Sequence, residues 1–126
     1  MELEIFGKKF PMKYTVSAQS EIAKRFGGLE KMQQVMESRG AAEALEDLAF
    51  MAAAMIRGAA RHERVKRKAM GEEPEEQVML TPEELADAFE LKDMASVREA
   101  VMAAMKEGQQ VTVEVEPSRK NAEATP

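Results

Sequence analysis

The sequence predicts an α+β fold that is mainly α, in which an N-terminal β-hairpin is followed by four to five helices. Two observations support this class. Residues 2–16 place apolar side chains at every second position on both sides of a short glycine-containing connection, which is typical of a hairpin. Most of the remaining chain spaces its apolar residues by three and four, which is typical of amphipathic helices. The 126 residues suit one domain, which we assign to residues 1–116.

The expected hairpin turns at Gly7-Lys8-Lys9. Before this connection, Leu3 and Ile5 alternate with charged residues. After it, the apolar residues keep the same period: Phe10, Met12, Tyr14 and Val16. A two-stranded hairpin is marginal by itself, so we expect one of its faces to pack across the helices.

Three helices should follow in the next fifty residues. Ser17 is a suitable N-cap for the first helix, which should end at Phe26 because Gly27 can adopt the left-handed conformation. A second helix should end at Gly40. The third and central helix carries an apolar stripe over more than four turns: Leu45, Leu48, Ala49, Ala52, Met55, Ile56 and Ala59.

The apolar stripe stops after Ala60, since the next buried positions would be Glu63 and Lys66. The helix should therefore leave the core there. We expect a flexible acidic linker over residues 71–80, and a new helix that begins with the capping box of Thr81 and Glu84.

A last helix should end at Gly108, and the alternation of valines at residues 111–115 predicts a short C-terminal strand. Residues 117–126 lack core-forming side chains, and we expect a disordered tail there.

Charge is distributed unevenly along the chain. Residues 57–70 hold 6 basic and 1 acidic side chains, whereas residues 71–126 hold 5 basic and 14 acidic ones. The candidate partner-binding residues lie on one helical stripe in the basic segment: Arg57, Arg61, Arg64 and Lys68. Three interpretations stay open, namely a face that is solvated or paired within the molecule, a protein partner, and nucleic acid, which we do not expect next to an acidic linker.

The residue types in the sequence indicate a protein that is not an enzyme and binds no cofactor. The chain has no cysteine, and its one histidine, His62, lies among charged residues without a catalytic partner. No apolar run approaches the roughly 20 residues that span a bilayer, and no signal peptide is recognisable. We therefore expect a cytosolic protein.

Methionine is abundant, with 11 of 126 residues. Seven of the methionines lie on predicted helices, mostly on the apolar faces. Flexible thioethers either fill an imperfect core or form a pliable surface that adapts to varied partners. Both interpretations can hold at different positions.

Residues 1–108 resemble the tail assembly chaperones of long-tailed bacteriophages and prophages. The matching features, in chain order, are Gly7-Lys8-Lys9-Phe10, Met12-Lys13-Tyr14-Thr15-Val16, Glu21-Ile22 and Arg25-Phe26-Gly27-Gly28-Leu29. An Ala- and Leu-rich central helix, a polar linker and a Thr-Pro-Glu-Glu-Leu helix start then follow in the order that this family shows.

This resemblance implies a non-catalytic protein of the host cytoplasm that binds the tape measure protein and assists tail tube assembly. Its expected partners are the tape measure protein and the tail tube protein, with a second copy of itself as a further candidate and no membrane. The alternatives are a small helical DNA-binding regulator and an antitoxin-like interaction protein. A DNA-reading helix would expose its N-terminal side chains to bases, but the central helix begins with Glu43, Glu46 and Asp47.

Overall fold

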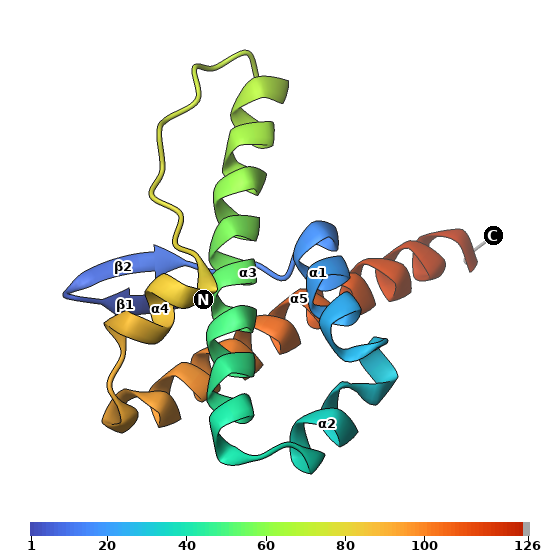
Figure 1. Cartoon of the computed structure of the whole chain (residues 1–126). Coiled ribbons are helices and arrows are strands. Elements are labelled where there is room, and N and C mark those ends of the chain that lie inside the picture. The colour runs from blue at the N-terminus through green and yellow to red at the C-terminus, as the bar shows by residue number, and fades with distance from the viewer. Residues whose placement is uncertain (125–126) are drawn as a thin grey trace.

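The computed structural model describes the backbone of residues 1–124, and the side chains of residues 1–28 and 30–109. The observed architecture confirms a mainly helical α+β fold with an N-terminal hairpin (Figure 1). The elements are β1 (Glu2–Ile5), β2 (Lys8–Pro11), α1 (Val16–Phe26), α2 (Leu29–Ser38), α3 (Ala41–Ala69), α4 (Pro82–Ala88), the 3₁₀ turn η1 (Leu91–Asp93) and α5 (Met94–Ala124).

Helix α3 forms the axis of the fold. The hairpin and α4 lie on one side of it, α1 and α2 lie on the other, and α5 crosses it (Figure 1). Between Asp47 and Ala60, all described residues except the partly buried Phe50 and Arg57 are buried, so this stretch of α3 contacts neighbours on every face. The prediction of a central core helix is confirmed.

Small residues let the neighbours of α3 approach closely. A Cβ atom at Gly58 would lie 2.9 Å from the carbonyl oxygen of Lys13 and 2.9 Å from Oγ1 of Thr15. The backbone amide of Lys13 also donates a hydrogen bond to the carbonyl of Met55, at 3.1 Å. The segment that leads from the hairpin to α1 therefore lies directly on the α3 backbone.

The hairpin exists, but its turn differs from the prediction. The turn residues are Phe6 and Gly7, both with positive φ (52° and 79°), and Leu3 pairs with Phe10 across the ladder. Two left-handed residues form a type I′ turn, whose twist matches that of the two strands. Placing Gly7 at the first turn position was wrong, because the glycine occupies the second.

Packing of the hairpin follows the predicted alternation as far as Met12. The buried side chains of this region are Leu3, Ile5, Phe10 and Met12. Val16, by contrast, is 86% exposed because it already begins α1. The N-cap of α1 is Thr15 rather than Ser17, since the extended backbone of Thr15 lets its Oγ1 accept a hydrogen bond from the amide of Ala18, at 3.2 Å. The end of α1 at Phe26 and the left-handed Gly27 are as predicted.

Helix α5 does not end at Gly108. A Cβ atom there would lie 3.0 Å from Cβ of Tyr14, so this glycine provides room for the tyrosine inside a continuous helix. Burial raises the pKa of the Tyr14 hydroxyl above its usual value.

The predicted strand at residues 111–115 is also wrong, because α5 continues through it to Ala124. Extending an existing helix adds a hydrogen bond per residue without a new nucleation step, and five alternating residues are a weak strand signal. Residues 117–124, which we expected to be disordered, belong to the same helix, and residues 125–126 lie outside the described residues.

Residues 71–81 form an irregular segment between α3 and α4, as predicted for the linker. The segment returns alongside the outer end of α3 (Figure 1). Helix α4 then begins with the predicted capping box: Glu84 donates its amide hydrogen to Oγ1 of Thr81, and its carboxylate accepts from the amide of Thr81.

Candidate partner-binding surfaces

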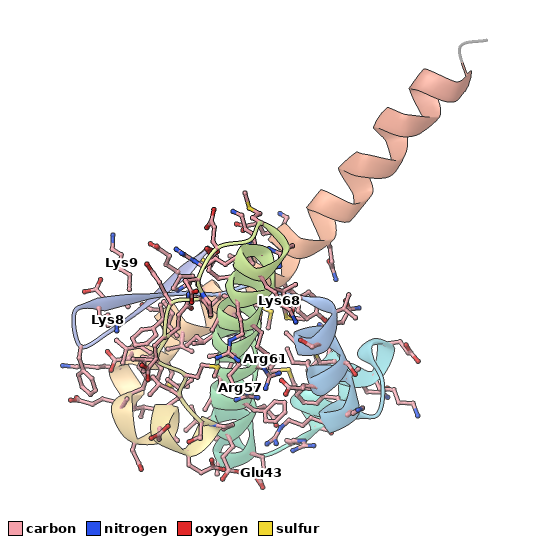
Figure 2. The ribbon with its side chains drawn as sticks, turned by 90° about the horizontal axis from the view of Figure 1, so that it is seen from above. Lys8, Lys9, Glu43, Arg57, Arg61 and Lys68 are labelled. Atoms are coloured by element: carbon pink, nitrogen blue, oxygen red, sulfur yellow. The ribbon has the colours of Figure 1, made fainter. Side chains whose placement is uncertain are left out.

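The four predicted binding residues follow one line along α3, and Figure 2 labels three of them. Arg57 is the innermost and pairs with Glu21 of α1, Nη2 to Oε2 at 3.1 Å. Arg61 lies 3.9 Å from the same carboxylate and is half exposed. Arg64 and Lys68 are exposed, and no ion pair joins either of them to another described residue. The inner half of the stripe is therefore paired within the molecule, and only the outer half is open to a partner.

Arg67 is a basic residue that the stripe analysis did not include. Its guanidinium lies within 4 Å of three carboxylates, those of Glu63, Glu72 and Glu75, and donates a hydrogen bond to the carbonyl of Glu73 at 3.4 Å. These contacts hold the acidic segment against the outer end of α3. The i,i+4 spacing of Glu63 and Arg67 could have predicted their ion pair from the sequence. The pairs of Arg67 with Glu72 and Glu75 could not be predicted in this way, because they depend on the path that the chain takes after α3.

Asp47 is the second residue whose role was not predicted. Its side chain is fully buried and accepts from Nε of Arg25 at 2.9 Å and from Nη1 of Arg39 at 3.4 Å. The two arginines also lie over aromatic rings, Arg25 over Phe50 at 4.6 Å and Arg39 over Phe26 at 5.8 Å. One carboxylate therefore connects α1, the α2–α3 junction and α3.

The Asp47 contacts explain why α2 holds its position with few buried side chains of its own. None of the described residues of α2 is fully buried, and Met32, Val35 and Met36 are partly buried. The helix follows two glycines with positive φ, Gly27 and Gly28, and is succeeded by Arg39. The ion pair of Arg39 with Asp47 fixes the C-terminal end of α2, whereas its face toward α5 stays open.

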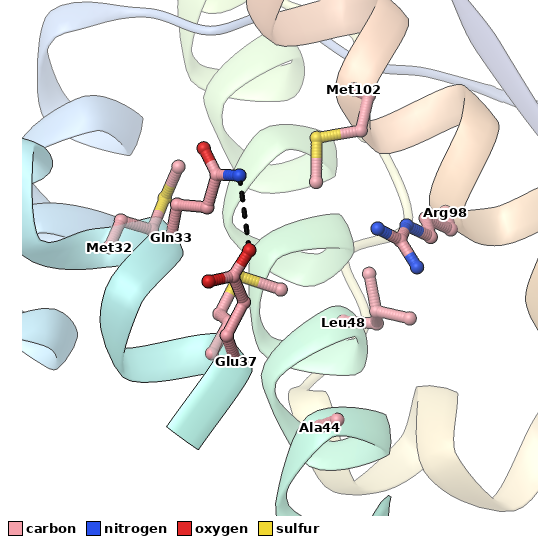
Figure 3. A pocket seen from close by; sticks show the side chains of 8 residues that line it. Met32, Gln33, Glu37, Ala44, Leu48, Arg98 and Met102 are labelled. Carbon is pink, nitrogen blue, oxygen red and sulfur yellow. Dashed lines mark hydrogen bonds between the residues drawn. The ribbon is translucent and has the colours of Figure 1, made fainter. Parts of the chain in front are cut away.

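A methionine-lined groove lies between α2, α3 and α5. It has a volume of about 400 Å³. Figure 3 shows Met32 on the α2 wall, Met102 on the α5 wall, and Leu48 with Ala44 on α3 between them. We call this surface the methionine groove.

Polar groups border the methionine groove on two sides. Gln33 donates a hydrogen bond to Glu37 along the α2 wall, Nε2 to Oε2 at 3.2 Å, and Arg98 stands on the α5 wall (Figure 3). Met102 is 37% exposed, whereas Leu48 at the base is only 7% exposed. The groove combines an apolar floor, movable thioether walls and a mixed-charge border, which is a suitable arrangement for the apolar face of a helix.

The methionines thus divide between core and surface. Met51, Met55 and Met105 are buried in the core, whereas Met32, Met36 and Met102 line the methionine groove. The core interpretation is confirmed for the three buried methionines, whereas an adaptable partner-binding surface stays a prediction for the three that line the groove.

Within the part of the chain that the structure describes, no helix is long and apolar enough to cross a membrane. The same residues contain no group of three or more His, Cys, Asp or Glu side chains arranged to hold a metal ion. Comparisons with protein-family models, with curated proteins and with solved structures gave no match.

Proposed function

We propose that this protein is a non-catalytic tail assembly chaperone of a long-tailed phage or prophage, and that its methionine groove holds a helical segment of the tape measure protein. The resemblance of residues 1–108 supports the choice of partner. The observation that carries the binding mode is the open groove between α2, α3 and α5, with Met32, Met36 and Met102 around Leu48.

The physical basis of this binding is the ability of methionine side chains to adapt to different apolar surfaces. A tape measure protein is long and presents many apolar helical segments that differ in sequence. Unbranched methionine side chains can rearrange to cover differently shaped apolar faces, at less strain than branched residues. A groove of about 400 Å³ accommodates a few apolar side chains of such a segment. Several chaperone molecules, each bound with moderate affinity to a different segment, would keep the tape measure protein soluble without requiring one particular segment sequence.

The placement of α2 supports the same proposal. This helix forms one wall of the groove, and its described side chains are at most partly buried. Because two glycines with positive φ, Gly27 and Gly28, precede α2, small changes in their backbone angles can tilt the helix as a unit. The wall can then adjust its distance from α5 while the Asp47 cluster keeps the far end attached.

In this proposal the protein works in the host cytoplasm without a cofactor, and the tail tube protein is a second partner. The exposed Arg64 and Lys68 would contribute to the association rate and its salt dependence more than to affinity.

The test is co-expression with the tape measure protein encoded in the same genome, followed by measurement of its soluble fraction and pull-down. The wild-type chain should keep the tape measure protein soluble and recover it in a complex. Met102→Glu should abolish both effects, because it places a charge on an exposed position of the groove wall. Val65→Glu is the matched control, since Val65 is 63% exposed on α3 and lies outside the groove.

An insoluble tape measure protein with the wild-type chain would contradict the proposal. DNA retained on the purified protein at the same time would favour a regulator instead. Equal loss with Met102→Glu and Val65→Glu would show that the groove is not the binding surface.

A further inference from the structure

A second apolar groove lies on the other side of the first turns of α3. It is formed by α3, the end of α4, η1 and the start of α5, and has a volume of about 310 Å³. Ala44 and Leu48 of α3 line the methionine groove, whereas Leu45 and Ala49 line this one. One residue corresponds to about 100° around a helix, so the two grooves face different directions and can be tested separately.

Large apolar side chains are exposed around the second groove. Leu91 is 76% exposed and Leu45 is 36% exposed, and both border the groove. Phe89 and Met94 are partly buried between them and provide an aromatic and a thioether surface. Scattered single leucines are normal on protein surfaces, but large apolar side chains gathered around a concave surface are typical of an interaction site.

The border of this groove is acidic. Glu46 and Glu90 are part of its lining. Residues 82–93, which form most of one wall, hold five acidic side chains and one basic side chain, Lys92. Lys92 lies 3.7 Å from Glu90, but both side chains are at least three-quarters exposed, so water and salt screen this pair.

Two of the wall carboxylates accept hydrogen bonds in helix capping. Glu84 accepts from the amide of Thr81, and Asp93 accepts from the amide of Glu90. Glu83 and Asp87 are exposed and form no ion pair with any other residue that the structure describes. The wall therefore presents a net negative potential next to the apolar surface.

We propose that this acid-bordered groove binds an amphipathic helix whose apolar face is flanked by lysine or arginine. The apolar face of the partner would cover Leu45, Phe89 and Leu91, and its basic side chains would approach Glu46 and Glu90. This chemistry differs from that of the methionine groove, whose border carries both Arg98 and Glu37. The acidic border opposes the phosphates of nucleic acid, which makes a basic protein segment the matching partner.

The experiment measures binding of labelled model peptides to the full chain by fluorescence anisotropy. The probe is a helical peptide of about four turns with leucines on one face and lysines beside them. One comparison peptide has glutamates in place of the lysines, and another has serines in place of the leucines. The Leu/Lys peptide should bind more tightly than either comparison peptide, and its affinity should fall as salt is raised.

Variants then locate the site. Leu91→Ser and Glu90→Lys are both at exposed positions, so the fold should tolerate them, and each should weaken binding by about tenfold or more. Glu99→Lys makes the same charge change at an exposed position of α5 outside both grooves and is the matched control, which should stay close to wild type.

Three results would overturn the proposal. The first is equal binding of the Leu/Lys and Ser/Lys peptides, which would mean attraction by net charge alone. The second is a loss with Glu99→Lys as large as that with Glu90→Lys. The third is self-association of the chain in sedimentation velocity that Lys68→Glu and Glu90→Lys each abolish, which would make a second copy the occupant.

Discussion

The two halves of α3 belong to one helix and yet lie in opposite environments. Between Asp47 and Ala60 the helix is surrounded by α1, α4, α5 and the hairpin, and most of its residues are buried. From Arg61 to Ala69 the helix projects from the core, and every residue except the partly buried Glu63 and Arg67 is exposed (Figure 1). The comparison shows that burial stabilises the inner half, whereas helix propagation and ion pairs must stabilise the outer half.

The residue types of the two halves agree with these environments. Alanine, methionine and glycine dominate the inner half, where small side chains permit close packing. The outer half is rich in arginine and lysine, which lower the free energy of the last helical turns through the macrodipole. Arg67 adds its contacts with Glu63, Glu72 and Glu75. Removing a side chain should therefore cost several times more free energy in the inner half.

The largest effect is expected for Ile56→Ala. Ile56 is 2% exposed in the inner half, and removing its outer carbons leaves a cavity against the hairpin and linker side of the core. The free energy of unfolding should fall by about 2–5 kcal/mol. Chemical denaturation with Val65→Ala as the control measures this, since Val65 is 63% exposed and should change by no more than about 0.5 kcal/mol. Equal losses of unfolding free energy for Ile56→Ala and Val65→Ala would contradict the inference that burial stabilises only the inner half of α3.

A smaller loss is expected for Asp47→Ala, the one charged residue buried in the inner half. Breaking a fully buried ion pair costs about 3–5 kcal/mol. Arg25 and Arg39 are each about 30% exposed, so water can partly solvate them once the carboxylate is gone. We expect a loss of about 1–3 kcal/mol. Glu46→Ala, at the exposed neighbouring position, is the control, and an equal effect there would show that the two arginine contacts stabilise little.

Gly58→Ala should destabilise the chain, although alanine is the better helix former by about 0.5–1 kcal/mol. The new Cβ atom would lie 2.9 Å from the carbonyl oxygen of Lys13, which belongs to the backbone and cannot rotate away. Overpacking of this kind typically costs about 1–3 kcal/mol, which leaves a net loss centred on about 1 kcal/mol after the helix gain. Thermal or chemical unfolding measures the sign of the change, and a stabilised variant would mean that the segment between the hairpin and α1 does not pack on α3.

The fold class and the inner half of α3 were predictable because they depend on local patterns. The stripe from Leu48 to Ala59, the capping box at Thr81 and the glycine stop at Gly27 are signals that a few neighbouring residues determine. The hairpin was recognised for the same reason. Its turn was misplaced by one residue, because the sequence does not show whether Gly7 takes the first or the second left-handed position.

The misread Gly108, the missed role of Asp47 and the two grooves depend on contacts between residues that are distant in the chain. Gly108 resembled a helix stop, and only the approach of Tyr14 explains it inside α5. Asp47 resembled an exposed acid, because its partners Arg25 and Arg39 lie 22 and 8 residues away in the chain. Each groove is lined by residues from three or more helical elements, so the sequence of a single segment does not predict it. The predicted stripe residues Arg57 and Arg61 proved to share one acid, Glu21, from another helix.

Arg67→Ala should change global stability by less than about 1 kcal/mol, because its ion pairs are partly solvated. Its main effect should be local. Without the guanidinium, the acidic segment after α3 loses its contacts through the carboxylates of Glu72 and Glu75 and the hydrogen bond to the carbonyl of Glu73, and it should open more often. Cleavage by a glutamate-specific protease under native conditions reports that open population, and we expect it to accelerate. Lys66→Ala is the control, and equal cleavage of the two variants would show that Arg67 does not hold the segment.

Arg61→Ala should have the smallest effect of the series. Arg61 lies at the boundary between the halves, is half exposed, and is 3.9 Å from a carboxylate that Arg57 already contacts at 3.1 Å. Glu21 therefore keeps its closer partner when Arg61 is removed. Exposed ion pairs contribute about 0–1 kcal/mol, and a shared one should lie near the lower limit, so we expect a change within about 0.5 kcal/mol. Chemical denaturation of both arginine variants measures the difference. Arg57→Ala should cost more, because its side chain is only 18% exposed and its aliphatic carbons are packed. A larger loss of unfolding free energy for Arg61→Ala than for Arg57→Ala would show that the buried half of α3 extends about one turn further, to Arg61.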